Sequence, residues 1–178
     1  MSRISVPAAE AATGATAELF AQIRKAAGTV PNAYAAVGAL DPAALKVMLA
    51  ADAALAGSTL SRQDRETVKL IVSEVAGCDY CVAAHAMLGK MVGLSPEALK
   101  QIRAGQATGD AKRDALVHFV LNLQTTRGTI SESEFAAIRA AGYSDTQLAD
   151  ISLTIAMTIF TNTFNRINDT DVDFPPVK

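Results

Sequence analysis

The 178-residue chain is predicted to fold as one all-α domain over residues 1–178, a single helical bundle. Half of its residues are apolar, which suffices to bury one substantial core and is little for two. Aromatic residues make up only 5% of the chain and Trp is absent, which favours close packing of small-residue helices over aromatic-rich strands. Residues that start and stop helices recur along the chain, and few strand candidates lie between them.

The N-terminal third is predicted to contain two helices. The first spans about residues 9–27 and ends before Pro31, which lacks a backbone donor and restricts its neighbour. Asp41 followed by Pro42 has the pattern of an N-cap and a first helical residue, so a second helix is expected from there to Gly57.

The middle of the chain carries two helices joined by a very short turn. Ser61 is predicted to cap the first helix, and Gly77 to end it. The second helix begins near Cys78 and ends at Gly93. Further helices are predicted from Ser95 to Gly105, from Asp110 to about Thr126, and over residues 132–141 and 144–167, the last two with capping boxes at Ser131 and Ser144.

Charge and hydropathy exclude several classes of function. The 16 basic and 18 acidic side chains leave a net charge of -2, which is too balanced for binding nucleic acid through bulk charge. The N-terminus has no apolar stretch of signal-peptide length, and the most apolar late segment, residues 151–164, is too short and too polar to cross a bilayer. We therefore expect a cytoplasmic protein without membrane contact, in which both cysteines stay reduced.

The chemistry is concentrated around a CxxC pair. Cys78 and Cys81 lie three residues apart at the first turn of a helix, so both sulfurs face one side, close enough for a disulfide after modest adjustment. The positive end of the helix dipole and the unpaired backbone donors there favour thiolate over thiol. His85 lies one turn beyond Cys81, placed to take its proton and return it to a leaving group, so Cys81 is expected to be the better-activated thiol.

Glu66 is predicted to complete the site. If the helices on either side of Gly77 pack antiparallel, a residue eleven positions before the turn lies opposite one eight positions after it, which pairs Glu66 with His85. A carboxylate there would orient the imidazole and stabilise its charged form, giving a relay of Cys81, His85 and Glu66. Tyr80, between the two cysteines, is a further candidate donor to the site.

Each of these residues also has a purely structural interpretation. The cysteines and His85 are ordinary core residues in that interpretation, Glu66 is a solvated carboxylate near a helix start, and Tyr80 packs beside the turn. Glu74 competes with Glu66 because it also lies close to the CxxC pair, although on a helix it can simply face water. His118 has no other candidate residue near it in the sequence and is interpreted as structural or exposed.

Metal binding and a thioredoxin-like fold are both disfavoured. Structural zinc usually takes two separated pairs of Cys or His ligands, and this chain has a single CxxC that only His85 and a glutamate could supplement. The thioredoxin motif follows a strand in an alternating βα pattern, which is not predicted here. No metal and no cofactor are therefore expected.

Residues 60–66 followed by residues 78–85 resemble the core of the AhpD-like alkylhydroperoxidase family, within the carboxymuconolactone decarboxylase superfamily. Its signature is a glutamate twelve residues before the first cysteine, then CxxC, then a histidine four residues after the second cysteine, and all of these match here. The layout from residues 30–32 to the tail at residues 171–175 also resembles the peroxidase-related branch. The characterised alkylhydroperoxidases carry a histidine where this chain has Tyr80.

The resemblance implies an all-helical AhpD-like fold that assembles as a homo-oligomer, with its redox core at about residues 60–92, and a peroxidase that reduces a small-molecule hydroperoxide. In that cycle Cys81 attacks the peroxide, the His85–Glu66 relay protonates the alkoxide, and Cys78 resolves the sulfenate as a disulfide. A thiol reductant protein or a dihydrolipoyl carrier must then reduce the disulfide.

Two other functions stay open on the sequence alone. A decarboxylase or lactone-processing enzyme of the same superfamily would need a pocket for a small anionic substrate and no redox-active pair, so the two cysteines argue against it. A non-enzymatic redox sensor would use the disulfide to move a helix or an interface without turning over peroxide.

Overall fold

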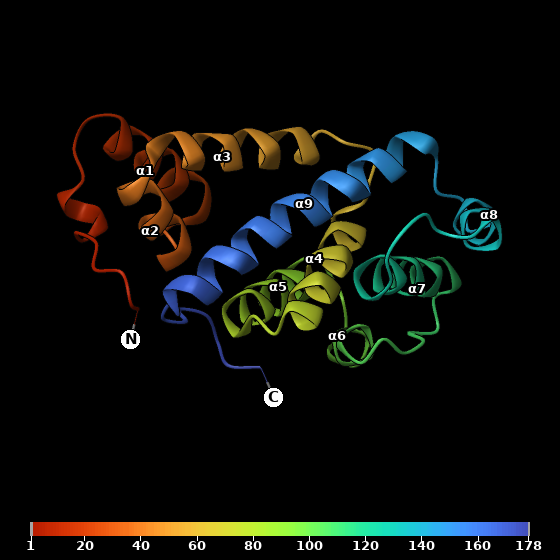
Figure 1. Cartoon of the computed structure of the whole chain (residues 1–178). Helices are drawn as coiled ribbons and strands as arrows, with labels where there is room; N and C mark the ends of the chain where they lie inside the picture. The colour runs from red at the N-terminus through yellow and green to blue at the C-terminus, as the bar shows by residue number, and fades with distance from the viewer. Residues whose placement is uncertain (1, 178) are drawn as a thin grey trace.

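The computed structural model describes residues 2–177, and all of their regular structure is helical (Figure 1). Among these residues, no helix is both long enough and apolar enough to span a membrane. The elements are a short 3-10 helix, η1 (Ala9–Ala11), and α1 (Gly14–Ala27), α2 (Asn32–Leu40), α3 (Pro42–Ala56), α4 (Arg62–Ala76), α5 (Asp79–Met91), α6 (Pro96–Arg103), α7 (Ala111–Thr125), α8 (Glu132–Ala140) and α9 (Asp145–Asn168).

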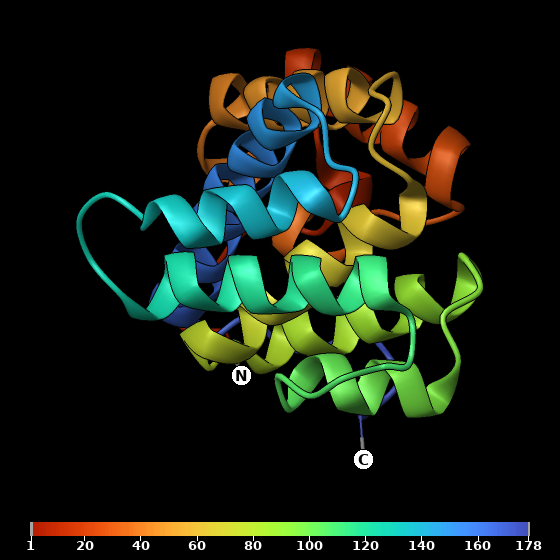
Figure 2. The ribbon, with the colours of Figure 1, turned by 90° about the vertical axis from the view of Figure 1, so that its right-hand side faces the viewer.

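Helix α4 is the central element of the molecule. It packs most extensively against α5, α7 and α9, and it also contacts α6. In Figure 1, α1 and α2 lie at one end of the molecule and α7 and α8 at the other, with α4, α5 and α9 between them. Figure 2 shows α8, α7 and α6 in successive layers on the side that faces the viewer. The N-terminal and C-terminal parts of the chain therefore both pack around the predicted redox core.

The burial of α4 explains its central position. Val68 and Leu70 are both 0% exposed and belong to one cluster with Leu116 of α7 and Ile151 of α9. Truncating a fully buried leucine in such a core costs about 2–5 kcal/mol. The helix that carries Glu66 is therefore held in place from several sides.

Most of the predicted helix starts are confirmed, because the capping side chains accept the hydrogen bonds expected of them. These capping residues are Asp41, Ser61, Ser95, Asp110 and Ser144. Of the two hydrogen bonds of the capping box predicted at Ser131, only one forms. The Ser131 hydroxyl accepts from the Glu134 N–H, but the Glu134 carboxylate is bound by Asn122 of α7 instead of reaching back to the cap.

The helix predicted over residues 9–27 is confirmed at its end, Ala27, and is wrong at its start. The chain forms η1, becomes extended at Ala12 and Thr13, and enters α1 only at Gly14, whose φ is +56°. Gly14 adopts this left-handed conformation without the clash that a Cβ would cause. Thr13 is the N-cap of α1 but its side chain makes no capping hydrogen bond, so the usual start signal does not operate there.

Helix α2 is absent from the elements expected from sequence. The sequence predicts only an interruption at Pro31, but this proline is the N-cap of α2, with φ -60° and a carbonyl that accepts from the Ala35 N–H at 2.9 Å. No side chain caps this end of α2, so the usual start signal is missing. The helix matters for the site because it carries Ala33 and Tyr34 to the cysteines.

Candidate active site

The turn between α4 and α5 sets the geometry of the site. Gly77 ends α4 in the left-handed conformation, with φ +63°, and Cys78 is the N-cap of α5. The Cys78 N–H donates to the Ser73 carbonyl at 3.1 Å and the Gly77 N–H to Glu74 at 3.0 Å, which closes the end of α4. The two helices therefore reverse direction within two residues and pack against each other.

The predicted approach of Glu66 and His85 across this hairpin is confirmed. His85 Nδ1 lies 2.9 Å from Glu66 Oε2, and both side chains are largely buried. Burial alone would raise the pKa of Glu66, but the charge and hydrogen bond of His85, with help from Lys69 and Arg65, hold that pKa below its ordinary value. A carboxylate at Nδ1 leaves the other ring nitrogen to exchange a proton with a reacting group.

The two cysteines are reduced and share a hydrogen bond. Cys78 is 2% exposed and Cys81 is 3% exposed. The hydrogen bond from Cys81 lowers the pKa of Cys78 to about 7, whereas the same bond and burial raise the pKa of Cys81. This distribution differs from the expectation that Cys81 is the more acidic thiol, and its cause is that Cys81 donates within the pair. The dithiol therefore keeps one proton between two sulfurs near neutral pH.

Helix α9 contributes residues that the sequence did not predict. Asn165 Nδ2 donates to Cys81 Sγ at 3.3 Å across 84 residues of sequence, and the Asn165 residue is only 3% exposed. Asn165 and Thr161 both act to lower the pKa of Cys81, against the other influences on it. A sequence signal was available: polar residues recur on the buried face of α9, at Thr154, Thr158, Asn162, Asn165 and Asn168.

Tyr80 contacts α2 and the C-terminal tail. Its hydroxyl oxygen accepts from the Ala33 N–H at 3.1 Å, and its ring meets the ring of Phe174 edge to face, with centroids 5.3 Å apart. Burial raises the pKa of Tyr80, and its hydrogen bond with Asp173 raises it further. These contacts are those of a packing residue that closes the site against the tail.

A cavity of about 540 Å³ adjoins the cysteine pair. Cys81, His85 and Asn165 line it, together with a mostly apolar wall that includes four of the five methionines. The methionines are Met48, Met87, Met91 and Met157. Cys81 is therefore the sulfur that a small molecule in this cavity would meet.

One wall of the cavity is polar. The Tyr34 hydroxyl donates to Asp52 at 2.9 Å, and Lys69 Nζ lies 4.0 Å from Asp52 Oδ1 and 3.7 Å from Glu66 Oε1. Because His85 occupies the other oxygen of Glu66, each carboxylate oxygen has its own partner. A chain of polar contacts thus runs along the cavity from α2 to α5.

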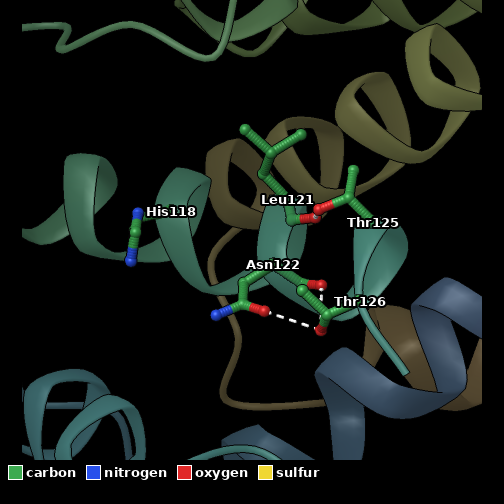
Figure 3. Close-up of a pocket in the computed structure, with 5 residues that line it drawn as sticks. All are labelled: His118, Leu121, Asn122, Thr125 and Thr126. Carbon is green, nitrogen blue, oxygen red and sulfur yellow. Dashed lines mark hydrogen bonds between the residues drawn. The ribbon is translucent and has the colours of Figure 1, made fainter. Parts of the chain in front are cut away.

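The remaining candidates lie away from this cavity. Glu74 Oε2 accepts from Arg103 Nε at 2.8 Å, so Glu74 does not take the place of Glu66. The His118 side chain is 74% exposed and lies 3.5 Å from Glu134 on the outer side of α7. Figure 3 shows His118 beside Asn122 at a surface pocket of about 220 Å³. No group of three or more potential metal ligands is found among residues 2–177.

Comparisons with known proteins show what the chain is similar to. Residues 42–120 match the model of the carboxymuconolactone decarboxylase family, whereas no curated protein matches the sequence. An AhpD-core, peroxidase-related protein from Ralstonia eutropha JMP134 is 23% identical, with a TM-score of 0.86 over 97% of this chain and 92% of that one. A peroxidase-related protein from Silicibacter sp. TM1040 is also 23% identical, with a TM-score of 0.83 over 96% of this chain and 91% of that one.

The same fold occurs in a protein with another named activity. A variant of the debrominase Bmp8, in complex with 2,3,4-tribromopyrrole, has a TM-score of 0.81 at 16% identity, over 97% of this chain and 94% of that one. At these identities the solved structures establish the fold, and the family match covers the segment that contains Glu66 and the CxxC pair. Residues 42–120 thus match the carboxymuconolactone decarboxylase family, and the chain has the fold of the AhpD-like solved structures.

Proposed function

We propose that this protein is a thiol peroxidase that reduces alkyl hydroperoxides through a dithiol and disulfide cycle of Cys78 and Cys81. The observation that carries this proposal is the 2.9 Å contact between His85 and Glu66, at a cavity that Cys81 also lines. That arrangement supplies a nucleophile and a proton carrier beside a space of substrate size. Two of the structural relatives are peroxidase-related by name, which agrees with the proposal.

The first step oxidises Cys81. The Cys81 proton moves to His85, and the thiolate attacks the terminal oxygen of the hydroperoxide. The S–O bond forms as the O–O bond breaks, so the sulfur loses two electrons and becomes a sulfenic acid. The departing alkoxide takes the proton from His85 and leaves as the alcohol. Glu66 stabilises the charged imidazole between these two transfers.

The second step forms the disulfide. The Cys78 thiolate, favoured by a pKa of about 7, attacks the Cys81 sulfur, the S–O bond breaks, and the hydroxide that leaves takes up a proton from solvent and becomes water. An external dithiol then reduces the disulfide by exchange, with a protein thiol or a dihydrolipoyl group as the donor we propose. This cycle requires a reducing compartment, and we place it in the cytoplasm.

The role of Tyr80 in this proposal is to close the site and not to transfer protons. Its hydroxyl is bonded to Ala33 and Asp173, so the relay runs through His85 and Glu66 alone. A Tyr80→Phe variant is therefore expected to keep most of the peroxidase rate, and a loss as large as that of Cys81→Ser would contradict this assignment.

We also propose that the protein assembles as a homo-oligomer. Helix α9 carries several exposed apolar side chains, and such side chains favour contact with another protein surface. These side chains are Leu153, Ile159, Phe160 and Ile167. Light scattering of the purified protein tests this, and a monomer at micromolar concentration would contradict it.

The test of the peroxidase proposal is peroxide consumption coupled to a dithiol. We expect the unaltered protein to reduce cumene hydroperoxide with dihydrolipoamide as the electron donor, and Cys81→Ser to lose this activity. Cys78→Ser is expected to undergo one round of oxidation and then stop. A sensor would instead form the disulfide without sustained turnover, and a decarboxylase would act on a carboxymuconolactone in Cys78→Ser as well.

A further inference from the structure

The Asn165 amide is the least expected group at the sulfur. It comes from α9, its Nδ2 donates to Cys81 Sγ, and it lines the cavity. Its other polar atom, Oδ1, is fully buried and has no hydrogen-bond partner among residues 2–177. A buried amide oxygen without a partner is unfavourable, and one beside both a cavity and a cysteine sulfur is a candidate to bind a ligand.

We propose that Asn165 is a catalytic residue that binds the sulfur of Cys81 with one end of its amide and the hydroperoxide with the other. This inference rests on the proposed peroxidase function. The terminal oxygen of a hydroperoxide carries an O–H, and Asn165 Oδ1, which has no partner among residues 2–177, accepts it once a small rotation of the side chain opens this atom to the cavity. The two ends of one amide thereby hold nucleophile and target oxygen side by side.

The bonding is consistent through the reaction. The Nδ2 donor favours the thiolate over the thiol, because a sulfur anion accepts a hydrogen bond more strongly. When the S–O bond forms and the O–O bond breaks, the same O–H becomes that of the sulfenic acid and remains on Asn165 Oδ1. The amide neither gains nor loses a proton, so its role complements the proton transfer that His85 performs.

Asn162, on the same face of α9, differs from Asn165 because both ends of its amide have hydrogen-bond partners. One turn earlier, Asn162 Oδ1 accepts from the Ser73 hydroxyl at 3.2 Å and its Nδ2 donates to the Val72 carbonyl at 3.3 Å. Both ends of that amide are satisfied by α4, which makes Asn162 a structural residue. The two asparagines have the same size and similar burial, so Asn162 offers a matched control.

The test compares two reactions of Cys81 in a Cys78→Ser background. One is oxidation by cumene hydroperoxide, followed by trapping the sulfenic acid with dimedone, and the other is alkylation by iodoacetamide. Both rates are proportional to the fraction of Cys81 present as thiolate. The ratio of the oxidation rate to the alkylation rate is therefore independent of that fraction and reports on contacts made to the peroxide alone. Circular dichroism and thermal unfolding check that each variant is folded.

Asn165→Ala is expected to slow alkylation and to lower the ratio about tenfold, since one hydrogen bond to the reacting oxygen is lost. Asn165→Asp keeps an acceptor of the same shape but places a carboxyl group beside the Cys81 sulfur. We therefore expect alkylation of Cys81 to slow in this variant, while the ratio of the oxidation rate to the alkylation rate stays close to that of the protein with Asn165. Asn162→Ala is expected to lower stability and to leave the ratio unchanged.

The outcomes separate this inference from the peroxidase proposal. If peroxide does not oxidise Cys81 in the protein with Asn165 present, the peroxidase function is wrong and this role fails with it. If oxidation occurs and Asn165→Ala has the same ratio, only the role of Asn165 is overturned. An equal loss of the ratio in Asn165→Asp and Asn165→Ala would also overturn it, because the acceptor would then be irrelevant.

Discussion

The Glu66 carboxylate has a partner at each of its two oxygens. His85 occupies Oε2 at 2.9 Å and Lys69 lies 3.7 Å from Oε1, so a charge that burial disfavours is retained. A second carboxylate, Asp52, holds Lys69 from the other side at 4.0 Å. The Glu66–His85 pair is therefore supported by a network that includes α3, and not by α4 and α5 alone.

The lowered pKa of Glu66 predicts how its contribution to stability depends on pH. A carboxyl group whose pKa is lower in the folded state stabilises the protein above its unfolded pKa, near 4.5, and this contribution is lost as the pH falls through the folded value. The difference in unfolding free energy between the unaltered protein and Glu66→Gln should therefore shrink as the pH falls below about 4.5. Urea unfolding at several pH values measures it, and a constant difference would contradict this role of the carboxylate.

The shared proton of the cysteine pair predicts a second effect of pH. Cys78 should ionise with a pKa of about 7, because Cys81 donates to it. In Cys81→Ala the donor is gone, so the midpoint of thiolate absorbance should move up toward the ordinary thiol value of 9.0. Cys81→Ser keeps a hydroxyl donor and should stay lower. Equal midpoints in the two variants would show that the hydrogen bond does not set this pKa.

At the scale of elements, the α4–α5 hairpin depends on one glycine. Gly77 has φ +63°, where an alanine costs about 1–2 kcal/mol. Gly57, which ends α3 with φ -86°, has ordinary right-handed geometry, and a Cβ added there would lie 3.7 Å from its nearest neighbour. Urea unfolding should therefore show Gly77→Ala destabilised and Gly57→Ala nearly neutral. Similar losses for both would mean that the turn conformation is not the cause.

Elements with a local start signal were predictable and those shaped by packing were not. Ser61 and Ser144 cap their own helices, so their positions follow from nearby residues. Helices α1 and α2 begin without a capping hydrogen bond from a side chain, α1 after the break at Ala12 and α2 at a proline. Their positions are fixed by contacts with the rest of the chain.

The contacts of the site also divide into those that the local sequence predicts and those that it does not. Glu66 and His85 are only 19 residues apart and are joined by one tight turn, so helix register alone predicts their contact. Asn165 reaches Cys81 from 84 residues away, and the cavity is lined by residues of α1, α3 and α9 as well. The direction in which the two thiols share their proton also depends on atomic positions, which residue spacing does not specify.

In the molecule as a whole, four parts of the chain meet at the cysteines. The α4–α5 hairpin supplies both cysteines and the Glu66–His85 pair, α2 and the tail close the site around Tyr80, and α9 supplies Asn165. The tail is tied to α2 because the Asn32 N–H donates to Asp173 at 2.8 Å. The bundle therefore buries a reactive pair while leaving Cys81 at a cavity.

The most direct test of the peroxidase cycle is mass spectrometry of the thiols before and after one equivalent of cumene hydroperoxide. We expect the reduced protein to form a disulfide between Cys78 and Cys81, and Cys78→Ser instead to stop with Cys81 as a sulfenic acid. Cysteines that remain reduced under these conditions, or oxidation that begins at Cys78 in a Cys81→Ser variant at the same rate, would contradict the proposed cycle.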